Sequence, residues 1–249
     1  MPSRMNTPGV RVHEARDESE YCTDTMCARY QTPGQAAAER YWQVIEPLWN
    51  FEASWRVLPT QQIPTVLALN GVTTGRMLRW GLIPYSGEVG YPLINATVEK
   101  LTTWYGWRYP WEHGRRCVFV MSGFYEPHVF PGSRKEPFYV HLRDRPIFGV
   151  AGIWDRRKSE DGSEALSCAL ITTPANELLA EVHNEKPRMP AVLREEDHAA
   201  WLTGSPEQAL RALEPYPSDG MEAWQVSRRL YANKTPDDVT LIERTGALA

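Results

Sequence analysis

The chain has 249 residues, enough for one large domain or two small ones with a sizeable core. Hydrophobic residues make up 42% and charged residues 23%, which is typical of a soluble globular protein and argues against a disordered chain. The formal net charge is −4, so bulk charge does not indicate a nucleic-acid-binding protein. Any contact with phosphates must come from a local cluster of Lys and Arg.

Targeting and cysteine patterns exclude further classes. No apolar run is long enough to span a membrane and the N-terminus lacks a signal-peptide core, so we expect a cytoplasmic protein. The four cysteines have no paired spacing, so we expect neither a disulfide scaffold nor a metal site, and no cofactor. Cys117 and Cys168 lie in apolar runs and are predicted to be buried, whereas Cys22 and Cys27 lie in polar sequence.

In chain order, residues 1–25 are polar and lack apolar periodicity, which predicts a disordered extension before a domain at 26–249. Thr32-Pro33 is typical of a helix start, and the helix is expected to end near Glu46. Asn70-Gly71 favours a tight turn, so the flanking segments 65–69 and 72–80 are predicted to form a hairpin.

The remaining pattern alternates strands with scattered helices. Strands are expected at 116–122, 138–142, 146–154 and 166–173, and helices at 175–181, 195–202 and 205–213, the last opened by a capping box at Ser205. Strands outnumber helices and no linker divides the chain. The sequence therefore predicts one α+β domain with a curved, mainly antiparallel β-sheet or barrel flanked by helices.

Polar side chains inside apolar sequence are the first candidates for chemistry. Asn95, Glu126 and His183 each occupy such a position, where an unpaired polar group is costly. Together with the Cys27 thiol they supply a nucleophile, two proton carriers and a hydrogen-bond donor. Each of them taken singly also fits a satisfied core or turn residue, and their spacing alone does not show that they converge.

Several motifs then resemble one family, the SOS response-associated peptidase (SRAP) family. In order, they are Met26-Cys27-Ala28-Arg29, Trp80-Gly81-Leu82-Ile83-Pro84, Asn95-Ala96-Thr97-Val98-Glu99, Gly123-Phe124-Tyr125-Glu126, His183 with Arg188-Met189-Pro190, and Val226-Ser227. They cover about residues 26–242. Each motif is modest alone, but six in the right order make the resemblance specific.

The resemblance implies covalent capture of abasic sites in single-stranded DNA during the DNA damage response. In this family the initiator Met is removed, and the α-amine of the resulting N-terminal Cys attacks the aldehyde of the ring-opened deoxyribose. The neighbouring thiol then closes a thiazolidine. An α-amine with a pKa of about 8 and a thiol with a pKa of about 8.5 suit this chemistry near neutral pH. Both groups belong to one residue, so ring closure is intramolecular.

By the same resemblance, Cys27 is the covalent nucleophile and Asn95 holds the amine or a sugar oxygen. Glu126 is the general acid and base, and His183 assists sugar ring opening. Six residues are candidates for contact with the DNA. They are Arg29 and Arg188 at phosphates, Trp80 and Tyr85 stacked on or wedged between bases, and Arg115 or Arg116 on a positive cleft face. Core packing is an equally weighted alternative for Trp80, and a solvated surface is one for the arginine pair.

Three departures from the family pattern affect this reading. Ala28 replaces a Gly, Thr97 replaces an Arg, and Cys27 does not stand near the start of the chain. A Cys that follows a peptide bond has no α-amine, so residues 1–26 must be absent or removed for this chemistry, most simply through initiation at Met26. Two alternatives remain: a thiol peptidase that cleaves its own chain before Cys27, and a non-catalytic single-stranded DNA-binding module. We expect a monomer with abasic single-stranded DNA as its partner and no membrane association.

Overall fold

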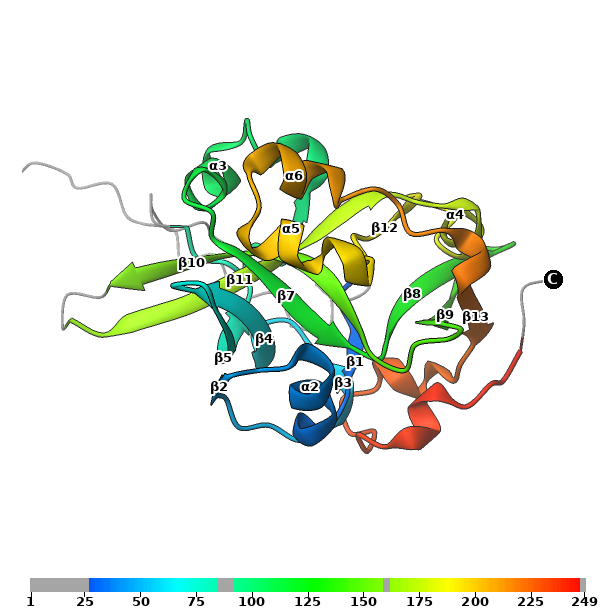
Figure 1. Cartoon of the computed structure of the whole chain (residues 1–249). Helices are drawn as coiled ribbons and strands as arrows, with labels where there is room; N and C mark the ends of the chain where they lie inside the picture. Colours follow the sequence, from blue (N-terminus) through cyan, green and yellow to red (C-terminus); the bar gives the residue numbers. More distant parts are fainter. Residues whose placement is uncertain (1–26, 85–91, 159–161, 247–249) are drawn as a thin grey trace, which may run out of the picture.

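We analysed a computed structural model of the chain, which describes residues 27–84, 92–158 and 162–246 (Figure 1). The strands are β1 (Tyr30–Thr32), β2 (Glu46–Leu48), β3 (Ser54–Val57), β4 (Gln62–Leu69), β5 (Val72–Trp80), β6 (Asn95–Thr97), β7 (Arg116–Met121), β8 (Gly123–Phe130), β9 (Arg134–Leu142), β10 (Phe148–Lys158), β11 (Glu164–Pro174), β12 (Arg188–Pro190) and β13 (Met221–Gln225). The α-helices are α2 (Gln35–Trp42), α3 (Tyr105–Glu112), α4 (Glu177–Val182), α5 (His198–Thr203) and α6 (Pro206–Arg211). Short 3-10 helices lie at η1 (Val98–Lys100), η2 (Glu195–Asp197), η3 (Ser218–Gly220), η4 (Arg228–Tyr231) and η5 (Val239–Ile242).

The centre of the molecule is a closed barrel of strands β5, β4, β7, β10 and β11. Neighbouring strands in this ring are antiparallel except where β11 meets β5 in parallel, with Cys168 opposite Trp80, and closes it. Large side chains from each strand fill the interior, including Leu78, Trp80 and Phe119. Closure removes the free sheet edges that would otherwise pair with other chains.

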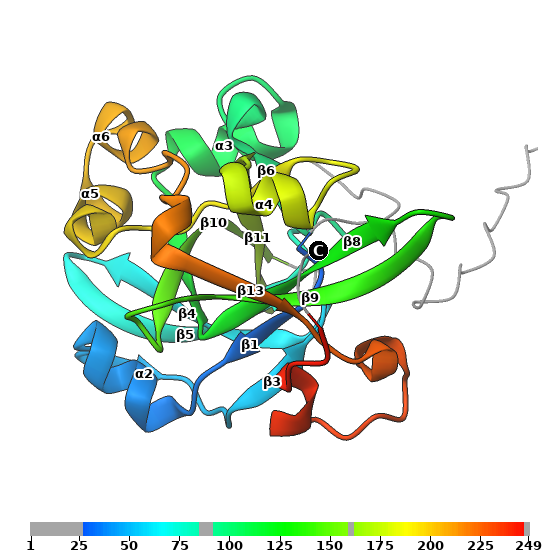
Figure 2. The same cartoon turned by 90° about the vertical axis from the view of Figure 1, so that its right-hand side faces the viewer.

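A second sheet, in the order β13-β9-β8-β1-β3, lies against the barrel (Figure 2). The chain passes from the barrel to this sheet at Ser122, because β7 ends at Met121 and β8 begins at Gly123. In the second sheet, Tyr30 of β1 pairs with Phe124 of β8. This register brings the residues just before β1 alongside the middle of β8.

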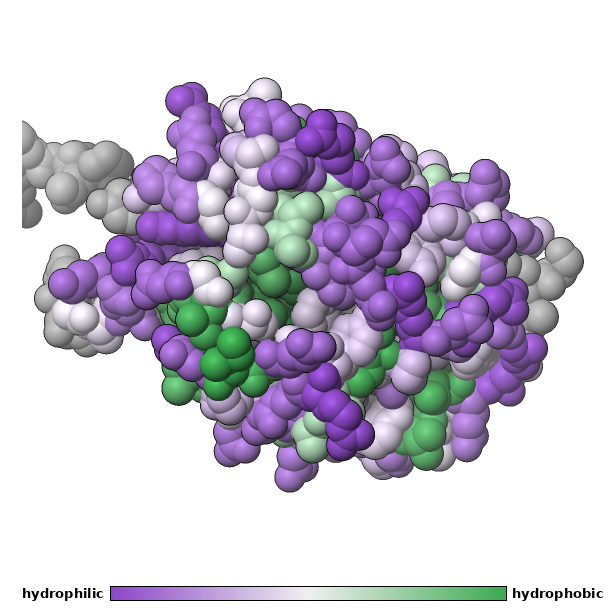
Figure 3. Space-filling view, viewed as in Figure 1, coloured by the Kyte–Doolittle hydropathy of each residue, from purple (hydrophilic) through white to green (hydrophobic). Residues whose placement is uncertain are grey.

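Helices cover the outside of the barrel. Trp107 and Trp111 of α3 and Trp201 of α5 are buried in a second core cluster with the outward-facing side chains of the barrel strands, such as Val118 and Ile171. Hydrophobic side chains also gather on the surface over β2 and the β4–β5 hairpin (Figure 3). None of the helices that the structure describes is both long enough and apolar enough to cross a lipid bilayer.

The structure confirms the predicted α+β class and the single domain with a mainly antiparallel, curved sheet. It confirms the hairpin, because Asn70 and Gly71 have φ values of 51° and 78°, the left-handed pair that a two-residue turn needs. It also confirms the capping box of α6, in which Ser205 accepts from the Gln208 backbone and the Gln208 side chain bonds back. Cys117 and Cys168 are buried, as predicted.

Two expectations were wrong or incomplete. Thr32 does not cap the first helix; it ends β1 and its hydroxyl donates to the Val120 carbonyl at 3.0 Å, so α2 begins later, after Gly34. The short strands β1 and β3 and the aromatic helix α3 were not predicted. The proposed extension 1–25, with Cys22, lies outside the described residues.

Candidate functional site

Cys27 lies three residues before the start of β1, in contact with Glu126 of β8. Its backbone N–H donates to Glu126 Oε1 at 3.1 Å, and its thiol donates to the same oxygen. The β1–β8 pairing continues beyond Tyr30, because the Tyr125 N–H donates to the Arg29 carbonyl at 3.1 Å, and this sets Cys27 beside Glu126. Cys27 also has a φ of 47°, a left-handed conformation that non-glycine residues adopt rarely and that often marks a functional position.

Glu126 is a carboxyl group held in an almost dry environment. Its side chain is fully buried, and burial raises its pKa to about 7, although the hydrogen bonds from Cys27 oppose this shift. Its second oxygen, Oε2, lies 3.5 Å from His183 Nδ1, and neither atom makes a hydrogen bond within the described residues. A carboxyl group with a pKa near neutrality can both accept and release a proton at physiological pH.

His183 follows the last residue of α4, and its backbone N–H donates to the Leu179 carbonyl at 2.8 Å. Burial, together with the charge of Lys186, lowers its pKa to about 4, so the imidazole is neutral near pH 7. Burial also raises the pKa of the Cys27 thiol, as does the charge of Glu126. The three side chains therefore form a buried chain of thiol, carboxyl and imidazole, each of which favours its uncharged form.

Asn95 begins β6, which runs parallel to β11 with Asn95 opposite Leu170 and Thr97 opposite Thr172. Its side chain is half-buried. A contact of Asn95 with the Cys27 amine or with a sugar stays a prediction.

Arg188 forms a fork-to-fork ion pair with Glu99 of η1, with Nη1–Oε1 at 2.9 Å and Nη2–Oε2 at 3.0 Å. Its Nε and Nη2 also donate to the Thr172 hydroxyl and carbonyl, at 3.2 and 2.7 Å. The positive charge of Arg188 lowers the pKa of Cys27, although less than burial raises it, so Arg188 lies close enough to influence the thiol. Its contact with a phosphate stays a prediction, and a phosphate would have to share the guanidinium with Glu99.

Arg29 is nearly buried, and its guanidinium lies over the ring of Tyr231, 4.9 Å from the centroid. Burial raises the pKa of Tyr231 to about 12, and the charges of Arg29 and Glu126 act on it in opposite directions. Tyr231 is therefore a neighbour of the site that sequence reasoning missed. The sequence indicated Glu99 only as a motif residue and predicted no role for it. The signal for Tyr231 is weak, because it lies four residues past Val226-Ser227 in a segment with no other pattern.

Trp80 is fully buried inside the barrel, where Nε1 donates to the Ile94 carbonyl at 3.0 Å and the ring meets Tyr30 edge-on at 5.4 Å. The stacking role predicted for Trp80 is therefore wrong, and its core-packing alternative holds. Tyr85 lies outside the described residues.

The arginine pair at the start of β7 is also structural. Arg115 forms an ion pair with the buried carboxylate of Asp155. Arg116 is 6% exposed, donates to the Gly204 carbonyl at 2.5 Å and lies within 5.9 Å of the rings of Trp111 and Trp201. The expectation that either residue forms a positive cleft face was wrong, because the protein itself occupies both guanidinium groups.

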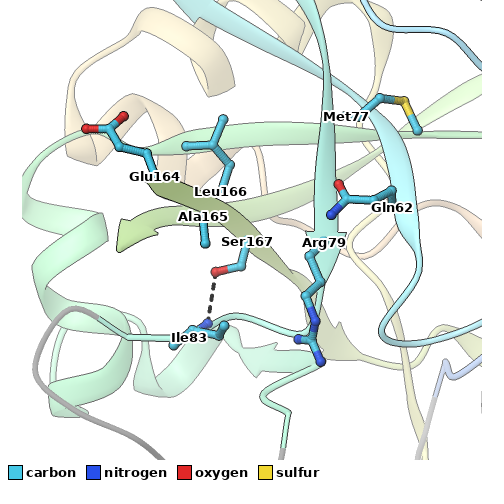
Figure 4. Close-up of a pocket in the computed structure, with 8 residues that line it drawn as sticks. All are labelled: Gln62, Met77, Arg79, Ile83, Glu164, Ala165, Leu166 and Ser167. Carbon is cyan, nitrogen blue, oxygen red and sulfur yellow. Dashed lines mark hydrogen bonds between the residues drawn. The ribbon is translucent and has the colours of Figure 1, made fainter. Parts of the chain in front are cut away.

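A cavity of about 240 Å³ lies between β5 and β11, lined by side chains that include Arg79, Glu164 and Ser167 (Figure 4). It contains no member of the Cys27 cluster. Within the described ranges, no three His, Cys, Asp or Glu side chains are grouped so as to hold a metal ion.

Comparison with known proteins places this geometry in a family. Residues 26–233 match the model of the SOS response-associated peptidase (SRAP) family. The chain is 33% identical over 189 residues to the abasic site processing protein YoqW of Bacillus subtilis, covering 73% of this chain and 82% of YoqW. It is 35% identical over 124 residues to the abasic site processing protein YedK of Escherichia coli, covering 49% and 52%. A crystal structure of a protein from Bacteroides thetaiotaomicron superimposes with a TM-score of 0.78 at 25% identity, covering 88% of this chain and 99% of that one.

The chain therefore belongs to the SRAP family. The Cys27–Glu126–His183 cluster lies within the matched region.

Proposed function

We propose that this protein captures abasic sites in single-stranded DNA covalently through the α-amine and thiol of Cys27. One observation carries the proposal: the backbone nitrogen and the sulfur of a single cysteine both contact one carboxylate oxygen of Glu126. An aldehyde carbon joined to both atoms would form a five-membered ring beside a proton carrier. The names of YoqW and YedK, abasic site processing proteins, support the same substrate class.

The reaction balances as a condensation that releases one water. The α-amine of Cys27 attacks the C1′ aldehyde carbon of the ring-opened sugar and forms a carbinolamine. Loss of water gives an imine, and the sulfur then attacks the imine carbon. The thiol proton passes to Glu126 and the imine nitrogen takes up a proton, which leaves a thiazolidine. Because amine and thiol belong to one residue, the second bond forms at a high effective concentration.

The pKa values of the cluster suit these transfers. With Cys27 in a peptide bond, burial raises the pKa of Glu126 to about 7. The carbinolamine nitrogen is likewise uncharged, so at that stage Glu126 can protonate the departing hydroxyl and then receive the thiol proton. His183, with a pKa of about 4, is neutral and offers a nitrogen lone pair for opening the sugar ring. Cleavage of the DNA strand from the imine is a possible side activity of this chemistry, and sulfur attack suppresses it because it consumes the imine.

The proposal requires a form of the protein that begins at Cys27. Protein initiated at Met26 should lose that Met, because Cys has a small side chain. It should then form a heat-stable adduct with abasic single-stranded DNA on a denaturing gel. Cys27→Ala should abolish the adduct. Cys27→Ser should abolish it as well, because an oxazolidine is much less stable, although Cys27→Ser retains the amine.

The matched control is protein initiated at Met1, with its intact mass measured. It should form the adduct only if residues 1–26 have been removed, which its intact mass would show. Loss of residues 1–26 that His183→Ala blocks would favour the self-cleaving thiol peptidase. Binding of abasic DNA without an adduct in either form would favour the non-catalytic binding module. An adduct of equal yield from uncleaved Met1 protein would overturn the proposal and indicate another nucleophile.

A further inference from the structure

A row of three aromatic rings runs from the core to the surface at the start of α3. The Trp107 ring is 4% exposed and packs in the outer core cluster. The Trp104 ring lies 4.8 Å from it, and the Tyr105 ring lies 4.7 Å from Trp104. Tyr105 itself is 59% exposed, so the row ends in a ring that is supported on one side and open to solvent.

Gly106 makes this arrangement possible. A Cβ at this position would lie 1.9 Å from the Trp104 ring, so any other residue would displace Trp104 from beneath Tyr105. Tyr105 is also unusual on the surface. Among the large hydrophobic side chains that are exposed in the described residues it is the one aromatic; the others are Ile45, Leu48, Leu210 and Val239. The row is therefore an aromatic cluster that ends in one exposed ring, rather than a scattered apolar residue.

The position of the row connects it with the Cys27 site. Glu99, six residues before Tyr105, is the ion-pair partner of Arg188, whose charge acts on Cys27. Ala96 of β6 and Trp107 of α3 are buried in the same outer core cluster. Because Glu99 and Tyr105 are six residues apart, their Cα atoms are separated by at most about 21 Å. A stacked DNA strand that rises about 3.4 Å per nucleotide covers this distance in about six steps. The exposed Lys100 lies between, with no ion pair among the described residues.

We propose that Tyr105, supported by Trp104, stacks on a base of the same DNA strand whose abasic site is held at Cys27. This inference rests on the proposed function and names a second contact for its substrate. An abasic nucleotide has no base, so the protein must gain its stacking energy from neighbouring nucleotides. An exposed ring accepts any base, because every base has a π-face, and the Lys100 ammonium adds attraction to the backbone between the two contacts.

The test uses single-stranded oligonucleotides with one abasic site and one 2-aminopurine, moved stepwise from one to eight nucleotides on either side. Stacking on Tyr105 should quench 2-aminopurine at one or two neighbouring positions on one side only. Tyr105→Ala should remove this quenching and weaken binding about tenfold, the loss expected for one base–aromatic stack. Tyr105→Phe keeps the ring and should retain both. Leu210→Ala, an exposed apolar truncation on α6, is the matched control and should behave as wild type.

The same titration with Cys27→Ala protein separates this inference from the proposed function, since it measures binding without an adduct. If quenching depends on position and Tyr105→Ala removes it, base stacking on Tyr105 is supported even if no form of the protein crosslinks. If Tyr105→Ala forms the adduct with normal yield and its quenching and affinity are unchanged, the stacking role of Tyr105 is wrong, and the proposed function is unaffected. A thermal melt of each variant checks that the exposed substitution leaves the fold intact.

Discussion

Two carboxylates with fully buried side chains lie in different parts of this molecule, and their partners differ. Asp155 of β10 contacts the Arg115 guanidinium, so its negative charge is compensated. Glu126 of β8 contacts the Cys27 thiol and approaches the His183 imidazole, neither of which supplies a positive charge at neutral pH. Burial then raises the pKa of Glu126 to about 7. Equal burial gives a structural ion pair in one place and a carboxyl group with a pKa near neutrality in the other.

Glu126→Gln offers the sharpest test of this contrast. The amide keeps the shape of the side chain but cannot carry the proton that leaves the thiol. We expect the rate of adduct formation by the Cys27-initiated protein to fall by about 100-fold or more, the usual contribution of general acid–base catalysis. Single-turnover assays on denaturing gels measure the rate. The matched variant Asp155→Asn should leave it nearly unchanged, and a comparable slowing there would show that Glu126 has no special role.

Arg115→Ala tests the other half of the comparison. Removing the guanidinium leaves the carboxylate of Asp155 buried without its ion-pair partner. We expect the free energy of unfolding to fall by about 3 kcal/mol, as for other broken buried pairs. Urea titration measures this loss, and the salt dependence of DNA binding should not change. If Arg115→Ala has wild-type stability and its DNA binding depends less on salt, Arg115 contacts the DNA after all.

The pH dependence of stability should expose opposite contributions from Glu126 and His183. The folded-state pKa of Glu126 is raised from 4.5, so its contribution is fully present below that pH and is lost as pH rises to about 7. The folded-state pKa of His183 is lowered from 6.5, so its contribution is present above that pH and is lost as pH falls to about 4. The two should largely cancel between pH 4.5 and 6.5, since each is worth about 3 kcal/mol over its own window.

Single substitutions should reveal each contribution separately as a change of the free energy of unfolding with pH. The chain to use is the one in which Cys27 follows a peptide bond. Glu126→Gln should become more stable as pH rises from 4 to 6.5, whereas His183→Asn should become less stable from 4.5 to 7. Urea titrations at half-unit intervals measure both. Profiles of the two variants that run parallel to each other would contradict the assignment of opposite shifts.

The sequence was most informative where local chemistry decides the structure. Asn70-Gly71 predicted its turn because few residues adopt a left-handed conformation, and Ser205 predicted its cap because its hydroxyl bonds within the first turn. Residue type alone, however, could not separate Arg115 from Arg188. Both precede or begin strands, yet the partner of each, Asp155 or Glu99, is brought to it by the tertiary fold.

The candidate site shows the same limit. Motif order indicated Cys27, Glu126 and His183, and the structure places them in contact. The shift in the Glu126 pKa depends on burial among residues that are distant in the sequence, such as Cys27 and His183, and no local pattern records this. Tyr231 was missed for this reason, because its packing on Arg29 joins residues about 200 positions apart in the sequence. Trp80 was ambiguous because an aromatic residue in a strand suits both a core and a base-stacking surface.

Thr97→Arg should have the smallest effect and tests how Arg188 is used. Thr97 stands on β6 opposite Thr172, where the family pattern has an arginine, and it lies two residues before Glu99. A guanidinium introduced here would share Glu99 and free part of Arg188 for a phosphate. We expect single-stranded DNA affinity to rise a few-fold, with the salt-dependence slope steeper by about 0.7 for one added phosphate contact. Fluorescence anisotropy at several salt concentrations measures both quantities. Thr97→Gln, of similar length and without charge, is the control and should leave the slope as in wild type. An unchanged slope in Thr97→Arg would mean that the strand does not pass the Glu99–Arg188 pair, and that this pair, like Arg115 with Asp155, only holds the fold.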